Sequence, residues 1–95
     1  MNSLFHIHNK KVLIIDDEVD LCMLMKSYYQ RKNCKVRVAH TPEHGLQLIQ
    51  EAIPDVILLI IQVCINPKVT IRQIKEVAPD AELIVNDPPN YGFRF

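Results

Sequence analysis

The stretch KVLIIDDEVDLCMLMKSYY, residues 11–29, joins a short apolar run to an amphipathic helix pattern. Residues 11–15 are β-branched or aliphatic after the first lysine, which is typical of a strand buried on both faces. Three acidic residues, 16–18, interrupt the run. Apolar residues then recur at three- and four-residue spacings at Val19, Leu21, Cys22, Leu24, Met25 and Tyr28. The stretch therefore predicts a strand followed directly by a helix.

The same alternation continues along the chain. Residues 35–39 predict a second strand, and Thr41-Pro42 predicts the capped start of a second helix. The apolar run PDVILLIIQV begins at Pro54 and predicts a third strand over residues 55–61. After Pro54 and Asp55, six consecutive apolar residues follow, and no polar side chain appears again before Gln62.

A third helix and a fourth strand complete the regular pattern. Asn66-Pro67 repeats the cap-then-proline start of the second helix. A fourth strand is predicted over residues 81–85, and residues 86–95 form an irregular tail with two prolines and a glycine.

This order predicts an α/β fold with a doubly wound parallel sheet, because each helix is long enough for a right-handed crossover. Ligands of such sheets bind outside the carboxyl ends of the strands, where the strand order reverses. We therefore expect a site at Asp16 and Asp17, after the first strand, and around Ile60 and Ile61, at the end of the third.

Composition indicates one small globular domain over residues 1–95, with 48% hydrophobic and 23% charged residues. Eleven basic and eleven acidic residues cancel, so no field of one sign draws the chain to nucleic acid or an anionic membrane. No apolar stretch is long enough to span a bilayer, and no signal peptide is evident. The odd set Cys22, Cys34 and Cys64 predicts buried thiols in a reducing cytoplasm.

The residues resemble the receiver domain of two-component response regulators over positions 10–86. KVLIIDDEVDLCMLMKSYY is similar to that family's first strand, acidic pair and first helix. PDVILL is similar to its third strand, and IKEVAPDAELIV to its third helix and fourth strand. The resemblance implies a flavodoxin-like fold and a place in a phosphorelay.

The family's chemistry transfers a phosphoryl group from a kinase phosphohistidine to an aspartate at the end of strand three. A magnesium ion offsets the charge on the transferring oxygens. By resemblance, Asp16 and Asp17 match the acidic pair that holds this ion, and weak magnesium binding is expected of them. The phosphoacceptor position holds Ile60, which has no lone pair for the attack.

Other parts of the family pattern are missing. Cys64 stands where a proline is expected, and Asn86-Asp87 replaces the hydroxyl residue after strand four. The fifth strand with its lysine and the last helices have no counterpart, so we expect a degenerate, C-terminally short receiver with about four strands and three helices. Without the last helix, part of one sheet face and the edge of strand four are expected to be exposed. We expect this exposure to lead to self-association as a homo-oligomer such as a dimer, to a bound partner, or to marginal stability.

These observations predict a cytoplasmic, non-enzymatic signalling domain that acts by protein interaction with a histidine kinase or output protein. One alternative is a phosphoacceptor domain that uses magnesium and another carboxylate, Asp87 or Asp17. A second alternative is a non-functional receiver fragment. His40 and His44 have a spacing that suits metal binding, but without a third ligand nearby a solvated polar face is the favoured interpretation.

Overall fold

The structure, a computed structural model, describes residues 7–86. Most of the predicted tail, including the alternative acceptor Asp87, lies outside this range. The elements follow one another in the order β1 (Lys11–Ile15), α1 (Val19–Gln30), β2 (Lys35–Ala39), α2 (Pro42–Glu51), β3 (Val56–Ile60), the 3-10 turn η2 (Ile61–Val63), α3 (Pro67–Val77) and β4 (Glu82–Asn86).

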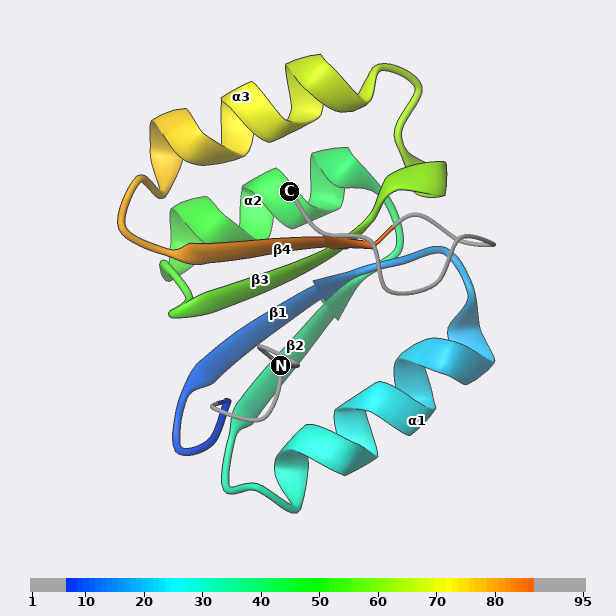
Figure 1. The fold of residues 1–95 in the computed structure, drawn as a ribbon, viewed down its shortest axis with the longest axis vertical. Helices are drawn as coiled ribbons and strands as arrows, with labels where there is room; N and C mark the ends of the chain where they lie inside the picture. The colour runs from blue at the N-terminus through cyan, green and yellow to red at the C-terminus, as the bar shows by residue number, and fades with distance from the viewer. Residues whose placement is uncertain (1–6, 87–95) are drawn as a thin grey trace.

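The four strands form one parallel sheet in the order β2-β1-β3-β4. Helix α1 covers one face of the sheet, and α2 and α3 cover the other (Figure 1). The chain moves outward from β1 to β2 and then returns to the other side of β1 with β3. The predicted doubly wound α/β fold is thus confirmed, and the strand order reverses between β1 and β3, where a site was expected.

The two predicted helix caps are present. The Thr41 hydroxyl oxygen accepts a hydrogen bond from the His44 N–H at 3.1 Å, and the Asn66 side-chain oxygen accepts one from the Val69 N–H at 3.3 Å. Each cap precedes a proline in the first turn. Asn33 adopts a left-handed conformation with φ of 63° shortly after α1, as a residue that terminates a helix often does.

Two buried clusters lie on the two faces of the sheet. Every residue of β3 is buried, as expected for a central strand. The cluster on the α1 side contains Ile7, Val12, Ile14, Cys22, Tyr29, Cys34, Val56, Leu58 and Ile84. The cluster on the side of α2 and α3 contains Leu13, Ile15, Ala39, Ile49, Ile57, Leu59, Ile74, Ala78 and Val85.

The predicted boundaries of two strands are wrong by one residue. β3 ends at Ile60, and Ile61 begins the 3-10 turn, because an unbroken apolar run carries no signal for where its strand stops. β4 covers Glu82–Asn86, so Asn86 belongs to the sheet and not to the irregular tail.

The buried side of α1 also differs from the predicted apolar set. Cys22 and Tyr29 are its buried residues, whereas Val19, Met23 and Leu24 are 55%, 63% and 69% exposed. The sequence of α1 has apolar residues on both flanks of the helix, so periodicity alone does not select the flank that packs.

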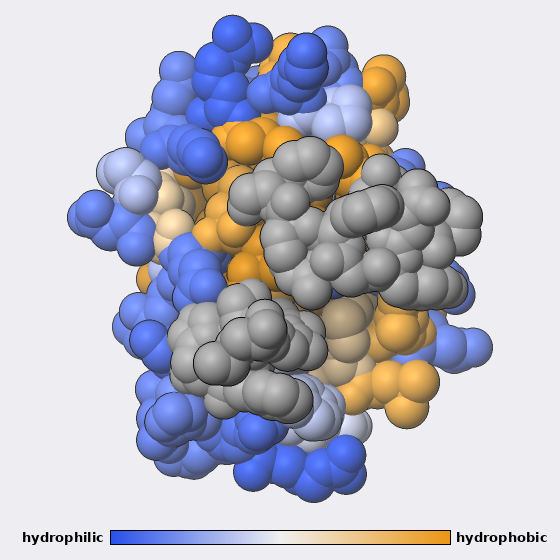
Figure 2. All heavy atoms as spheres, in the orientation of Figure 1, coloured by the Kyte–Doolittle hydropathy of each residue, from blue (hydrophilic) through white to orange (hydrophobic). Residues whose placement is uncertain are grey.

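The sheet face beside α1 is better covered than expected. Val56, Leu58 and Ile84 point to this side and are at most 5% exposed. The same cluster includes Ile7, which comes from the segment before β1 and is completely buried. Figure 2 shows hydrophobic residues gathered across the middle of this view, with hydrophilic residues toward its upper and lower ends.

Helix α2 lies unusually close to β1. A Cβ added to Gly45 would come within 2.5 Å of the Ile15 Cδ1, so a glycine permits this approach. The guanidinium of Arg37 in β2 donates to the carbonyl oxygens of Leu48, at 2.9 Å, and Ala52, at the end of the same helix. This side chain therefore links the β2 strand to the last turn of α2.

Candidate functional site

The candidate site is a row of four residues across the carboxyl edge of the sheet. Ile15 pairs with Ala39 on one side and with Leu59 on the other. One step beyond these pairs, Asp16 therefore lies between His40 and Ile60. Ile60 pairs in turn with Asn86. The order His40, Asp16, Ile60, Asn86 brings together Asp16 and Ile60, two of the four positions at which the sequence predicted a site.

Asp16 is buried although it carries a carboxylate, with 2% of its surface exposed. Its N–H donates to the Ala39 carbonyl at 3.0 Å, which continues the strand ladder, and its Oδ1 accepts from the Glu18 N–H at 3.2 Å. Among the described residues, its Oδ2 has no hydrogen-bond partner. An unsatisfied buried carboxylate oxygen is costly, and such groups are typical of ligand or proton sites.

The pKa of Asp16 is raised above the ordinary value of 3.8. Burial is the largest cause, because it disfavours the charged form. The negative charges of Asp17 and Glu18 act in the same direction, and the hydrogen bond from the Glu18 N–H opposes them. The group is thus poised to gain a proton or a cation.

The backbone carbonyl of Asp16 is held by two side chains. His40 Nδ1 lies 2.8 Å from this oxygen, and Cys22 Sγ donates to it at 3.3 Å. A carbonyl oxygen only accepts, so Nδ1 of His40 carries the proton in this arrangement. The 3.9 Å separation of the Cys22 sulfur and the His40 nitrogen follows from their shared acceptor.

Cys22 is not a nucleophile in this position. Burial raises the pKa of its thiol to about 11, and the charges of Asp16, Asp17 and Glu18 add to the effect. Because the thiolate is the reactive form, the protonated thiol serves as a hydrogen-bond donor beside the site.

Ile60 fills the place next to Asp16 with an apolar side chain that is 4% exposed. It offers no atom that attacks phosphorus or binds a cation. In the described part of the chain, no three His, Cys, Asp or Glu side chains converge in a manner that would hold a metal. The buried oxygen of Asp16 suits a cation, but the donor set lacks a third protein ligand.

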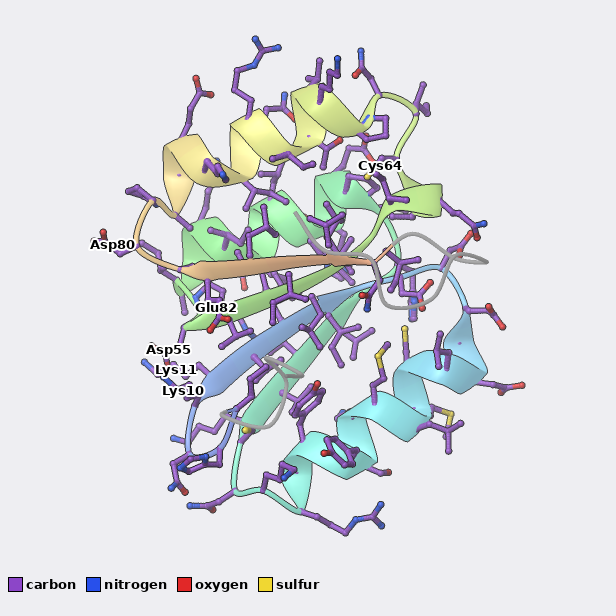
Figure 3. The ribbon with its side chains drawn as sticks, viewed as in Figure 1. Lys10, Lys11, Asp55, Cys64, Asp80 and Glu82 are labelled. Atoms are coloured by element: carbon purple, nitrogen blue, oxygen red, sulfur yellow. The ribbon has the colours of Figure 1, made fainter. Side chains whose placement is uncertain are left out.

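The remaining predicted residues are more dispersed. Asp17 is exposed, and Cys64 lies beyond the 3-10 turn with a pKa that burial raises. His44 is exposed one turn into α2, where its N–H completes the Thr41 cap. Asp55 lies at the opposite end of the sheet from Cys64 (Figure 3).

The contributions of His40 and Cys22 were not foreseen from the sequence. The sequence favoured a solvated polar face for His40, with metal binding as the weaker alternative, and a buried hydrophobe for Cys22. Their role depends on the β1–β2 register, which places the residue after β2 beside Asp16. The signal available in the sequence was that His40 and Asp16 each directly follow a strand.

An exposed apolar surface on α1 adjoins this row. Val19, Met23 and Lys26 of α1 line a small cavity of about 170 Å³ together with Cys22, Val38 and His40. Val19 and Met23 are more than half exposed. A hydrophobic contact surface thus begins next to the residues that support Asp16.

Solved structures of response regulators share the fold of this chain. NtrX from Brucella abortus in complex with ADP superposes with a TM-score of 0.75 at 22% identity, over 82% of this chain and 17% of that chain. A response regulator from Burkholderia pseudomallei with a phosphorylated aspartic acid, calcium ion and citrate gives 0.76 at 23% identity, over 82% and 46%. A response regulator receiver domain protein from Clostridium thermocellum gives 0.73 at 24% identity, over 81% and 64%.

The chain therefore has the flavodoxin-like fold of response regulator receiver domains, and it spans less than two thirds of the length of each of these proteins. No protein-family model and no curated protein matches the sequence. Within residues 7–86, none of the helices is long and apolar enough to cross a membrane.

Proposed function

We propose that this chain is a receiver-like signalling domain that acts by protein interaction and is not phosphorylated at the usual position. The observation that carries the proposal is Ile60 at the end of β3, one strand away from the buried carboxylate of Asp16. The phosphoryl acceptor of a receiver must be a nucleophile at this position. The domain is accordingly not an enzyme.

Asp16 and Asp17 hold magnesium weakly, if the acidic pair keeps its family role. Magnesium in proteins is typically bound by one or two carboxylates and several waters, which this pair can supply. The buried Oδ2 of Asp16 favours a cation, whereas the loss of a third ligand at Ile60 weakens its retention. The same oxygen binds a proton at low pH.

The partner is a protein of a two-component pathway, a histidine kinase or an output protein, in the cytoplasm. The exposed Val19, Met23 and Leu24 of α1 form its docking surface, because apolar residues of this size on one helix offer a partner helix a surface to bury. Self-association through the sheet face beside α1 remains a prediction, although Val56, Leu58 and Ile84 are well covered. Equal numbers of acidic and basic residues leave no net positive charge that would attract nucleic acid to this domain.

Phosphorylation with a small-molecule donor tests the proposal. The chain is incubated with acetyl phosphate and magnesium, and its intact mass is measured before and after hydroxylamine. We expect no phosphoryl adduct on the wild-type chain and a hydroxylamine-labile adduct on the Ile60→Asp variant. The Ile60→Asn variant is the control, because it has a polar side chain of the same size as aspartate without the carboxylate.

A stoichiometric, hydroxylamine-labile adduct on the wild-type chain would overturn the proposal. It would favour the alternative in which another carboxylate is the acceptor, and peptide mapping would then distinguish Asp17 from Asp87. A chain that shows no cooperative unfolding transition in urea would instead support the alternative of a non-functional receiver fragment.

A further inference from the structure

A cavity of about 310 Å³ opens at the amino end of the sheet, where β1 and β2 begin. Within residues 7–86, three lysines line it, Lys10, Lys11 and Lys35, together with the carboxylate of Asp55. Figure 3 shows Lys10, Lys11 and Asp55 at this end of the sheet. Three positive charges are offset by one negative charge, so this lining is net positive at pH 7. A cavity with an excess of positive charge attracts anions.

Lys11 and Lys35 are neighbours across the β1–β2 pair. Each is the first residue of its strand, and their Cα atoms are partners in the register. Neighbouring strands lie about 4.8 Å apart, and partner residues project from the same face of the sheet. Like charges that face each other across two strands destabilise a sheet, and an anion bound between them relieves the repulsion. Both side chains are exposed, so an anion in solution reaches them.

Hydrogen bonds fix the backbone that carries these lysines. The Asn9 N–H donates to the Lys32 carbonyl at 3.0 Å, and the Lys35 N–H donates to the Lys10 carbonyl at 3.0 Å. The Asn33 side-chain amide donates to the Asn9 Oδ1 at 2.7 Å. The segment before β1 is thus tied to the segment before β2 at three points. A site whose walls are already held in place loses less entropy when it binds a ligand.

The groups around this cavity suit phosphate oxygens. All its cationic side chains are lysines, which bind phosphate as point charges, whereas planar carboxylates are typically recognised by the fork of an arginine. The Asn9 Oδ1 accepts the bond from Asn33, so the Asn9 Nδ2 keeps two hydrogens that can be donated to an anion. We propose that this cavity binds a small anion with two or three linked phosphate groups, held by Lys10, Lys11 and Lys35.

Asp55 opposes such a ligand and gives the proposal a sign that can be tested. Its Oδ2 accepts the Lys11 N–H at 2.9 Å, which keeps this carboxylate beside the lysines. Its negative charge repels phosphate, so we expect a modest affinity, with a dissociation constant on the order of 100 µM for inorganic triphosphate. Removing the charge should strengthen the binding of an anion and would weaken the binding of a cation.

Isothermal titration calorimetry of the full chain with inorganic triphosphate tests the proposal. We expect Lys11→Gln/Lys35→Gln to weaken binding at least about tenfold and Asp55→Asn to strengthen it about threefold. Lys68→Gln/Lys75→Gln is the matched control, because it removes the same charge from two exposed lysines of α3, outside the cavity. We expect this control to bind within about twofold of the wild-type chain, since distant exposed charges are largely screened.

The amide chemical shifts of the chain locate the ligand. We expect inorganic triphosphate to shift the amides of residues 9–12 and 33–36. The starts of α2 and α3 are the alternative place for an anion, because helix N-termini attract negative charge, and we expect their amides to change little. Linked phosphates occur free and on nucleotides, so uridine triphosphate is titrated in parallel. Equal affinity assigns binding to the phosphates alone, and tighter binding at the same amides adds a contact to the nucleoside.

The choice of phosphate is tested with a second polyanion. A hexaglutamate peptide carries more negative charge than triphosphate but only carboxylates, and we expect it to bind at least about tenfold more weakly. If the peptide binds as tightly as triphosphate, the cavity is not a phosphate site.

The proposal is independent of the proposed function, because it requires neither Ile60 nor the exposed side of α1. Absence of heat and of shift changes up to about 5 mM triphosphate, well above the expected dissociation constant, would overturn it. Equal weakening by the two double lysine variants, weaker binding by Asp55→Asn, or shifts centred on the starts of α2 and α3 would also overturn it. Circular dichroism verifies that each variant is folded.

Discussion

Asp16 and Asp55 lie at opposite ends of the paired strands β1 and β3, and their surroundings differ in nearly every respect. Asp55 is exposed, and its carboxylate accepts the Lys11 N–H at 2.9 Å. Its own N–H and carbonyl are bonded to Lys11 and Glu82. Asp16 is buried, has one oxygen without a partner among the described residues, and has a raised pKa.

The charges around the two aspartates also differ. Residues 16–18 make the carboxyl end acidic, whereas Lys10, Lys11 and Lys35 line a cavity of about 310 Å³ with Asp55 at the other end. Figure 3 shows Lys10, Lys11 and Asp55 together at that end. The polar groups of Asp55 at the amino end are thus hydrogen-bonded. At the carboxyl end the buried carboxylate of Asp16 has an energetic cost that the hydrogen bond from the Glu18 N–H offsets only in part. Such a cost is expected at a site that binds or once bound a ligand.

The strongest test of the difference between the two ends of the sheet is to place a third carboxylate beside Asp16, at the carboxyl end. We expect Ile60→Asp to lower the free energy of unfolding by about 3 kcal/mol in EDTA, because it buries an unpaired charge beside Asp16. Magnesium should recover about 1–2 kcal/mol of this loss by binding the folded state. Urea unfolding with and without magnesium measures both effects.

Ile60→Asn provides the control for that experiment, because it has a similar volume change without a charge. It should lose stability in EDTA and gain none from magnesium. If magnesium has the same effect on both variants, the row at the carboxyl edge does not form a cation site even when the carboxylate is supplied.

The next effect comes from removing the charge of Asp16. We expect Asp16→Asn to raise the free energy of unfolding at pH 7 by about 1–2 kcal/mol, since the buried group no longer has to ionise. Because the folded-state pKa is raised, the stability that Asp16 contributes is present below its unfolded pKa, ordinarily 3.8, and is lost as the pH rises through the folded pKa.

The pH dependence supplies the internal check. The stability difference between Asp16→Asn and the wild-type chain should be small at low pH and should grow as the pH rises through the folded pKa of Asp16. Urea unfolding at several pH values measures it. A difference that is constant with pH would mean that the substitution acts through packing and not through ionisation.

The smallest effect on the free energy of unfolding is expected at Asp55, at the amino end of the sheet. Asp55→Ala removes an exposed acceptor of the Lys11 N–H and should lower the free energy of unfolding by about 0.5 kcal/mol. Asp55→Asn keeps an acceptor oxygen and should cost less. If either variant changes stability as much as Asp16→Asn, the two ends of the sheet are not energetically distinct.

Much of this fold could be predicted from the sequence because its signals are local. The caps at Thr41 and Asn66 combine a hydrogen-bonding side chain with a following proline, and the structure confirms both. The first two strands are bounded by charged or polar residues, and their predicted limits are correct. The third strand has no such residue at its carboxyl end, and the limits predicted for the third and the fourth strand are each wrong by one residue.

The candidate site could be predicted only in part, because its geometry depends on contacts between distant residues. Adjacent strand ends explain why Asp16 and Ile60 were expected near each other. The bond from His40 to the Asp16 carbonyl depends on strand register, and the unpaired Oδ2 depends on the complete set of neighbours. The packing side of α1 likewise depends on the sheet, which buries Tyr29 and leaves Leu24 exposed.

The bonds from Arg37 to the end of α2 have a consequence for local opening of the native state. The last turn of α2 contains no basic residue of its own, so the positive charge near its carbonyl groups comes from a neighbouring strand. We expect amide hydrogens in β2 and in the last turn of α2 to exchange with solvent as one cooperative unit. A substitution at Arg37 would therefore change amide hydrogen exchange throughout that helix turn. The sequence alone suggests only a charged residue on an edge strand.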